Sequence, residues 1–155
     1  PLIATTWSAV PFHTALRSAD WDGADWIGGG TALRGHFTVP PNRAVKSAKA
    51  YISGVGCVDF SLNGRRQSPE TFLNPGWAVL PTVRNLYTAL DISTAVAVGP
   101  NVIGLRLGMC KYGYVGAFCQ GAGGASERCR GAIVRVSIDF ADGGDSMIIM
   151  TTTKP

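Results

Sequence analysis

Short segments in which apolar and polar residues alternate recur along the chain. Between residues 57 and 63, for example, Val58, Phe60 and Leu62 alternate with polar residues. Because successive side chains of a β-strand point to opposite faces, this period of two predicts a strand with one buried face. Alternating or small-residue runs predict strands in six further segments, 33–39, 48–56, 86–92, 101–109, 131–140 and 147–153.

Turn residues separate these segments. The chain has 20 Gly and 9 Pro, whereas Glu and Lys, which favour long surface helices, are scarce. Asn63-Gly64 is typical of a tight hairpin turn, residues 141–144 indicate a second turn, and residues 93–98 indicate a short helical turn. We therefore predict an all-β fold, a jelly-roll β-sandwich of two antiparallel sheets. It would form a single domain over residues 1–155, with an extended lead-in over residues 1–19.

Charge and hydropathy exclude some partners. The formal net charge is +4, but Arg65-Arg66 is the only adjacent basic pair, so the basic residues indicate a solvated surface rather than a nucleic-acid-binding patch. No apolar run reaches the eighteen residues that a membrane span needs. We expect neither nucleic acid nor a membrane span among the partners of this chain.

The four cysteines are Cys57, Cys110, Cys119 and Cys129, and no two of them form a Cys-x-x-Cys motif. With only two isolated histidines, this spacing does not predict a zinc site. An even number of cysteines in a small glycine-rich domain is typical of two disulfides and of an extracellular, secreted protein. The alternative is four buried free thiols in an intracellular protein.

The sequence contains no recognisable catalytic motif. Gly-x-Ser-x-Gly, P-loop and dinucleotide-binding patterns are all missing, and neither His13 nor His36 has an obvious nucleophilic partner. Glycoside hydrolysis needs two carboxylates across the scissile bond, but most of the ten acidic residues occur in turn segments, where capping roles are common. We therefore expect the chain not to be an enzyme.

One predicted strand carries polar groups that could bind sugar hydroxyls. Asp59 lies inside that strand, where Asp is disfavoured, and it shares a face with Ser61 and Asn63. Aromatic residues that could stack on a sugar ring, Trp77 and Tyr112 among them, occur in the loops. The alternatives are a merely solvated face, an Asp59 that pairs with an arginine, and aromatics that anchor loops.

Several segments, taken in order, resemble one known family, the N-terminal β-sandwich domain of bacterial-type α-L-rhamnosidases. The segments are Asp25-Trp26-Ile27-Gly28, Leu33-Arg34-Gly35-His36-Phe37, Ala50 to Gly56, Asp59-Phe60-Ser61-Leu62-Asn63-Gly64-Arg65-Arg66, Leu73-Asn74-Pro75-Gly76-Trp77, Leu86 to Ile92, Gly99 to Gly108 and Asp139 to Gly143. The resemblance implies a jelly roll, an extracellular polysaccharide target and L-rhamnose as the sugar. Catalysis would lie in a separate helical barrel that has no counterpart here.

The resemblance also suggests a ligand set. Some family members bind the sugar through calcium, which makes Ca²⁺ the candidate cofactor. In this chain, Glu70-Thr71 occupies the segment where the family often carries acidic and amide residues. The hypothesis is that Asp59, Asn63 and Glu70 contact sugar hydroxyls. Ring-stacking residues would come from the loops, with Trp77, Tyr112 and Tyr114 as candidates.

The resemblance places the segments around Cys57 and Cys110 near each other, which suggests that these two cysteines pair. Cys119 and Cys129 flank a glycine-rich loop and would then form the second disulfide. The other two pairings stay open.

Three functions follow from the sequence. The first is a non-catalytic carbohydrate-binding module or small lectin that recognises L-rhamnose-containing glycans. The second is an excised accessory domain of an α-L-rhamnosidase with no ligand of its own. The third is a secreted protein-interaction domain built on the same fold.

Overall fold

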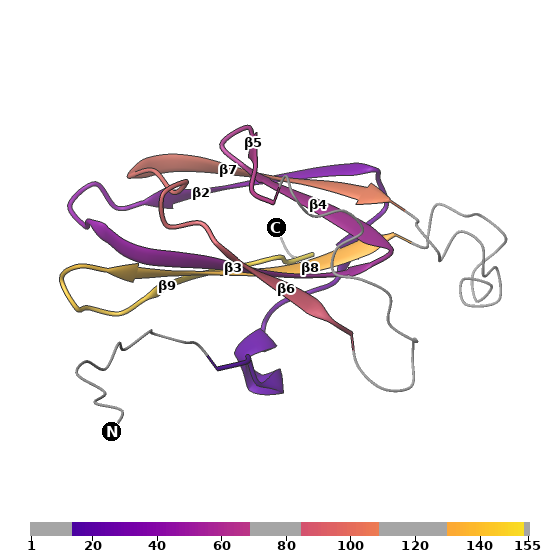
Figure 1. The fold of residues 1–155 in the computed structure, drawn as a ribbon, viewed down its shortest axis with the longest axis horizontal. Helices are drawn as coiled ribbons and strands as arrows, with labels where there is room; N and C mark the ends of the chain where they lie inside the picture. Colours follow the sequence, from indigo (N-terminus) through magenta and orange to yellow (C-terminus); the bar gives the residue numbers. More distant parts are fainter. Residues whose placement is uncertain (1–13, 69–84, 109–129, 154–155) are drawn as a thin grey trace, which may run out of the picture.

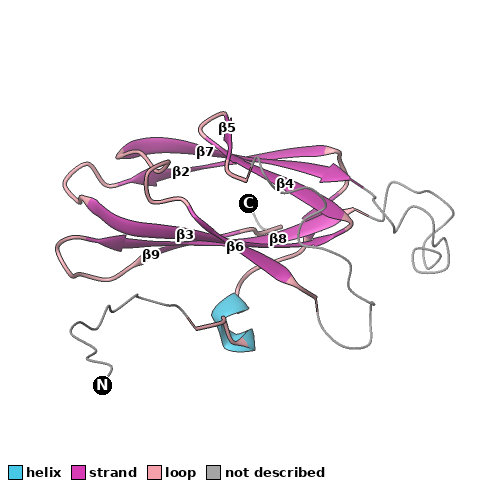
Figure 2. Ribbon diagram, viewed as in Figure 1, coloured by secondary structure: helices cyan, strands magenta, loops and turns pink. Residues whose placement is uncertain are grey.

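A computed structural model of the protein describes residues 14–68, 85–108 and 130–153. The described strands form two stacked antiparallel sheets (Figures 1 and 2). The first sheet has the order β1-β8-β3-β6, with β9 beside β1 on the same edge of β8, and the second has the order β2-β7-β4-β5. The first sheet contains β1 (Ile27–Gly28), β3 (Val45–Val55), β6 (Tyr87–Asp91), β8 (Gly131–Phe140) and β9 (Met147–Met150). The second contains β2 (Ala32–Val39), β4 (Cys57–Leu62), β5 (Arg65–Arg66) and β7 (Gly99–Gly108).

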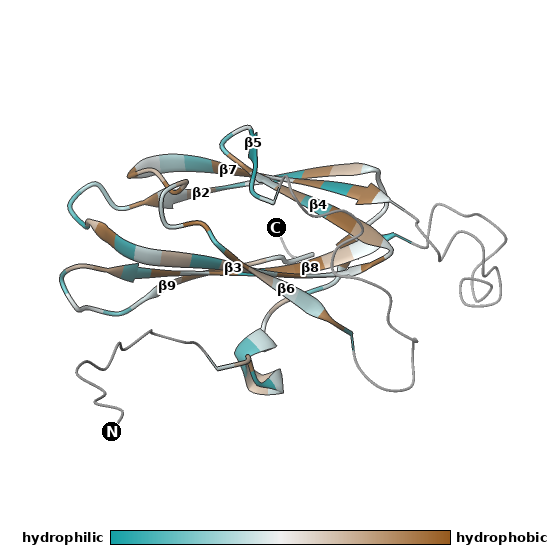
Figure 3. Ribbon diagram, in the orientation of Figure 1, coloured by the Kyte–Doolittle hydropathy of each residue, from teal (hydrophilic) through white to brown (hydrophobic). Residues whose placement is uncertain are grey.

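The core lies between the two sheets, and each long strand contributes alternate residues to it. Figure 3 shows the alternation of hydropathy along these strands. In β4, the buried residues are Val58, Phe60 and Leu62, whereas Asp59 and Ser61 lie on the outer face. The predicted all-β sandwich of two antiparallel sheets is therefore confirmed. The inward face predicted for β4 is also correct, and the same alternation buries Phe37 and Val39 of β2 and Val134, Val136, Ile138 and Phe140 of β8.

Strand ends were predicted less well. β1 and β5 were missed because each has only two residues, too few to show a period. The last strand ends at Met150 rather than at residue 153, because the chain beyond Thr151 turns to Asp25. The amide of Thr153 donates a 2.9 Å hydrogen bond to the Asp25 carboxylate, so it cannot extend the ladder with β8.

The predicted Asn63-Gly64 turn is confirmed. Both residues have positive φ, 52° and 78°, as a type I′ hairpin turn requires. Glycine and asparagine tolerate this left-handed backbone better than other residues do. The turn connects β4 to β5 and so determines which side chains of the two strands face each other, with Ser61 opposite Arg66.

A short 3-10 helix, η1 (Ser18–Trp21), lies against the outer face of the first sheet (Figure 2). The Trp21 and Tyr87 rings make an edge-on contact with centroids 5.9 Å apart, and Tyr87 is 6.0 Å from Tyr51 in the same manner. Tyr51 is consequently buried although it points away from the core. Ser53, on the same side of β3, is also buried and donates a 2.7 Å hydrogen bond to the Leu86 carbonyl. Part of the predicted extended lead-in is thus helical. Within the described ranges, no helix is long and apolar enough to cross a membrane.

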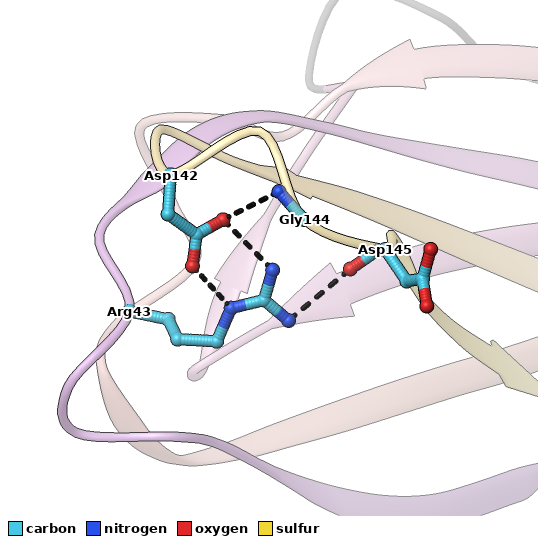
Figure 4. A network of polar contacts seen from close by, with 4 residues as sticks. All are labelled: Arg43, Asp142, Gly144 and Asp145. Carbon is cyan, nitrogen blue, oxygen red and sulfur yellow. Dashed lines mark hydrogen bonds and ion pairs between the residues drawn. The ribbon is translucent and has the colours of Figure 1, made fainter.

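Two loops at one end of the sandwich are joined by Arg43 (Figure 4). Its guanidinium donates two hydrogen bonds to the Asp142 carboxylate, of 2.7 and 2.8 Å, and a third to the Asp145 carbonyl. The guanidinium also lies 3.8 Å from the Phe140 ring centroid. The Arg43 guanidinium and the Gly144 amide together lower the pKa of Asp142 to about 2.

This ion pair predicts a pH dependence of stability. Because the pKa of Asp142 is lower in the folded than in the unfolded chain, its contribution is complete above about pH 4 and is lost as pH falls towards about 2. We expect Asp142→Asn to lower the melting temperature at pH 6, with the difference from the parent protein shrinking through this window. A difference that is constant from pH 6 to pH 2 would contradict this assignment.

A cavity of about 260 Å³ opens between the edges of the two sheets, and Gly35 lines it together with apolar residues such as Leu33, Ile103 and Val134. A Cβ atom added at Gly35 would meet no atom within 4 Å. We expect Gly35→Ala to raise the free energy of unfolding by about 0.5–1 kcal/mol, because it reduces unfolded-chain entropy without strain. Urea denaturation measures this change.

Gly54→Ala is the matched control, since its Cβ would overlap the Val58 side chain. Overpacking of this kind should destabilise the protein by about 1–3 kcal/mol. Equal effects at the two glycines would contradict the assignment of free space beside Gly35.

Candidate functional site

Asp59, the first residue of the predicted site, lies on the outer face of the second sheet. Its carboxylate forms a 2.5 Å ion pair with Arg66, and each side chain keeps about a third of its surface exposed, 32% and 34%. Arg106 of β7 lies directly opposite Asp59 in the register. The arginine partner that the sequence left as an alternative is therefore present, and part of the carboxylate stays accessible to a ligand.

Asn63, the second predicted residue, is engaged in the hairpin turn. Its amide nitrogen donates to the Ala95 carbonyl at 3.0 Å and to Asn101 Oδ1 at 2.9 Å. Its amide oxygen accepts a 2.9 Å bond from the Val102 amide. Three of its four hydrogen-bonding positions are thus used within the protein, and its role as a sugar ligand stays a prediction.

The other predicted site residues, Glu70, Trp77, Tyr112 and Tyr114, lie outside the described residues. Cys57 forms a disulfide, but Cys110, Cys119 and Cys129 also lie outside the described part of the chain, so the predicted pairing stays a prediction. Among the described residues, no group of three or more His, Cys, Asp or Glu could hold a metal ion. Calcium therefore also stays a prediction.

The structure shows a pocket that the sequence did not single out. It has a volume of about 340 Å³ and lies where β1, the end of β3 and the start of β8 meet. Trp26 stands beside it with 42% of its surface exposed, an unusual exposure for so large an apolar side chain. The remaining lining residues are Ile27, Gly28, Gly29, Val55, Arg130 and Gly131.

Glycines keep this pocket open. β1 and β8 pair through Gly28 and Gly131, and a Cβ atom at Gly28 would come within 2.5 Å of the Arg130 carbonyl oxygen. A Cβ atom at Gly131 would lie 3.8 Å from the Trp26 ring, so the indole packs over bare backbone. The ring is therefore held beside the pocket by the strand pair, and part of its surface faces solvent.

Arg130 adds a polar group to the same pocket. Its Nε atom is buried and has no hydrogen-bond partner among the described residues. A buried unsatisfied donor costs free energy, about 1–3 kcal/mol. An aromatic surface beside an arginine donor can hold a sugar by stacking on its C–H face and by bonding one of its hydroxyls.

Trp26 and Arg130 were missed as site residues because they are far apart in the sequence and meet only through the β1–β8 pairing. The available signal was local. Trp26 precedes three consecutive glycines, Gly28 to Gly30, and a large aromatic beside residues without side chains has little to cover it.

Comparisons with known proteins agree on one family. The sequence-family model described as the α-L-rhamnosidase N-terminal domain matches residues 43–154 of this chain. A search of the curated proteins finds no match. Among solved structures, the chain is similar to the α-L-rhamnosidase from Dictyoglumus thermophilum, with 22% identity, a TM-score of 0.67 and 87% of this chain covered.

Two further solved enzymes are also similar. One is the Streptomyces avermitilis α-L-rhamnosidase complexed with L-rhamnose, with 25% identity, a TM-score of 0.60 and 83% of this chain covered. The other is the native α-L-rhamnosidase from Aspergillus terreus, with 24% identity, a TM-score of 0.68 and 86% coverage. The chain spans only 16%, 12% and 16% of the three enzymes, in the order given.

Proposed function

Because this chain belongs to the family of α-L-rhamnosidase N-terminal domains, we propose that it is a non-catalytic domain that binds L-rhamnose-containing glycans. It would act beside a rhamnosidase catalytic domain, outside the cell, and bring that domain to its polysaccharide. The resemblance to the enzyme complexed with L-rhamnose supports the choice of sugar. The short stretch of each enzyme that the chain matches supports the accessory role.

The observation that carries this proposal is the half-exposed Trp26 ring beside the Arg130 pocket. L-Rhamnose is a deoxy sugar with a methyl group at C6, so it offers an apolar edge as well as hydroxyls. The indole would contact the C–H groups and the methyl, and the Arg130 guanidinium would donate to a hydroxyl. A single sugar in so open a site buries few atoms, so its affinity is weak, with a Kd on the order of 1 mM.

Calorimetry with L-rhamnose tests the proposal. We expect Trp26→Ala to weaken binding about 3- to 10-fold, in line with an aromatic contact worth about 0.5–1.5 kcal/mol. Trp26→Phe keeps a ring and should retain part of the affinity. Val98→Ala, at a residue with 51% exposure outside the pocket, is the control and should bind like the parent protein. Rhamnose binding that is unchanged in Trp26→Ala, or missing in the parent protein, would reject the site.

The same titration with a chelator addresses calcium. Affinity that falls in the presence of chelator would support the metal-bridged binding seen in some family members, whereas unchanged affinity would favour direct contacts.

The Asp59 hypothesis has its own test. Asp59→Asn removes the charge that holds Arg66. If Asp59 contacts the sugar, the variant should lose affinity, by about 1.5–3 kcal/mol for a charge-assisted hydrogen bond. A lower melting temperature with unchanged rhamnose affinity would restrict Asp59 to the ion pair.

We expect that the chain does not hydrolyse an aryl α-L-rhamnoside, because several described carboxylates are hydrogen-bonded to other side chains of the domain and so serve structural contacts. Asp25, Asp139 and Asp142 bond to threonine, serine and arginine side chains, respectively. Turnover that disappears on substitution of one acidic residue would contradict the non-catalytic role.

A further inference from the structure

The outer face of the second sheet carries an excess of positive charge. The strand register brings Arg34 of β2, Arg106 of β7 and Arg66 of β5 onto one face, with Asp59 as the acidic residue among them. Arg66 is paired with Asp59, whereas Arg34 and Arg106 are exposed and form no ion pair within the described part of the chain. We call this surface, with Ser61 at its centre, the arginine face.

The residues at the centre of the arginine face have shorter side chains than the arginines around them. Arg34, Gly104, Ser61 and Arg66 lie in one row across four strands, so the two arginines are three strand spacings apart, about 14 Å. Gly104 has no side chain, and a Cβ atom there would come within 2.5 Å of Ser61 Oγ. The row is therefore a shallow trough with arginines at its two ends and Arg106 beside it.

We propose that the arginine face binds an anionic polysaccharide through Arg34 and Arg106. The planar guanidinium is weakly hydrated, stays charged at all relevant pH values and donates two parallel hydrogen bonds to a carboxylate. Arg66, held in place by Asp59, lines the far end of the trough. A chain of a few sugar units with carboxylates would span the distance between Arg34 and Arg66. The inference deepens the proposed function by naming a substrate class, an acidic glycan, at a second surface.

The composition of the face favours a glycan over nucleic acid. Proteins that bind single strands stack bases on Trp, Tyr or Phe, and the described residues of the arginine face include none of the three. The Ser61 hydroxyl lies in the trough, where it donates a 3.1 Å hydrogen bond to the Gly104 carbonyl, and its oxygen can still accept a bond from a sugar hydroxyl.

Binding of polygalacturonate to the purified chain tests the inference. We expect the Arg34→Ala/Arg106→Ala variant to lose at least tenfold in affinity, and the parent affinity to fall as salt rises from 20 to 300 mM, because exposed charges are screened. The control is Arg17→Ala/Lys46→Ala, which removes the same two charges at exposed residues away from the face. It should retain most of the affinity, and melting temperatures should verify that both variants fold.

Several outcomes would overturn the inference. These are equal losses in the two double variants, equally tight binding of a neutral dextran, and tighter binding of a DNA duplex than of polygalacturonate. Dextran sulfate distinguishes a carboxylate-selective face, which would prefer polygalacturonate, from one selective for sulfate esters. The L-rhamnose titration with Trp26→Ala is independent of both arginines, so failure of the rhamnose site and failure of the arginine face are separable.

Discussion

Asn101→Ala should lower the free energy of unfolding by about 3 kcal/mol or more, because it leaves several buried polar groups without partners. Asn101 is completely buried. Its amide nitrogen donates to the carbonyls of Ala97, at 2.7 Å, and Gly99, at 2.9 Å. Its oxygen accepts from the Ala97 amide, at 2.8 Å, and from Asn63 Nδ2.

These bonds join the loop before β7 to the hairpin turn after β4, so the loss should be seen as a lower urea midpoint with an unchanged slope. Asn85→Ala provides the control, because Asn85 forms no hydrogen bond within the described ranges. Its effect should stay within about 0.5 kcal/mol. A similar small effect for Asn101→Ala would show that water replaces the lost bonds and would contradict the structural role of this side chain.

Leu62→Ala should be the second large perturbation, with a loss of roughly 2–5 kcal/mol. Leu62 has no exposed surface and packs in the core between the sheets, one residue before the Asn63 turn. Truncation removes buried methyl groups and leaves a cavity that the rigid strand ladder on both sides cannot fill.

Leu86→Ala makes the same chemical change at a leucine with 47% exposure. Since little apolar surface is returned to water there, we expect a change of less than about 1 kcal/mol. Thermal unfolding of both variants at one pH measures the difference. Comparable losses at the two leucines would contradict the assignment of Leu62 to the core and of Leu86 to the surface.

The sequence allowed the strands of the sandwich to be predicted, because alternation of apolar and polar residues is a local property. The faces of β2, β4 and β8 follow from the same alternation, as does the Asn63-Gly64 turn, whose backbone few other residues tolerate. Asp59 was correctly placed on the polar face of its strand. Its pairing with Arg66 stayed open because it depends on how the short β5 folds back.

Only the tertiary structure decided which residues meet. Strand order and register depend on pairing between segments far apart in the chain, and no local pattern specifies them. Through the β1–β8 pairing, Trp26 comes to lie over Gly131 beside Arg130. Through the order β2-β7-β4-β5, Arg34, Arg106 and Arg66 gather on one face, although the sequence shows them as dispersed charges. Alternation thus determined which side of a strand each side chain takes, and sheet topology decided its neighbours there.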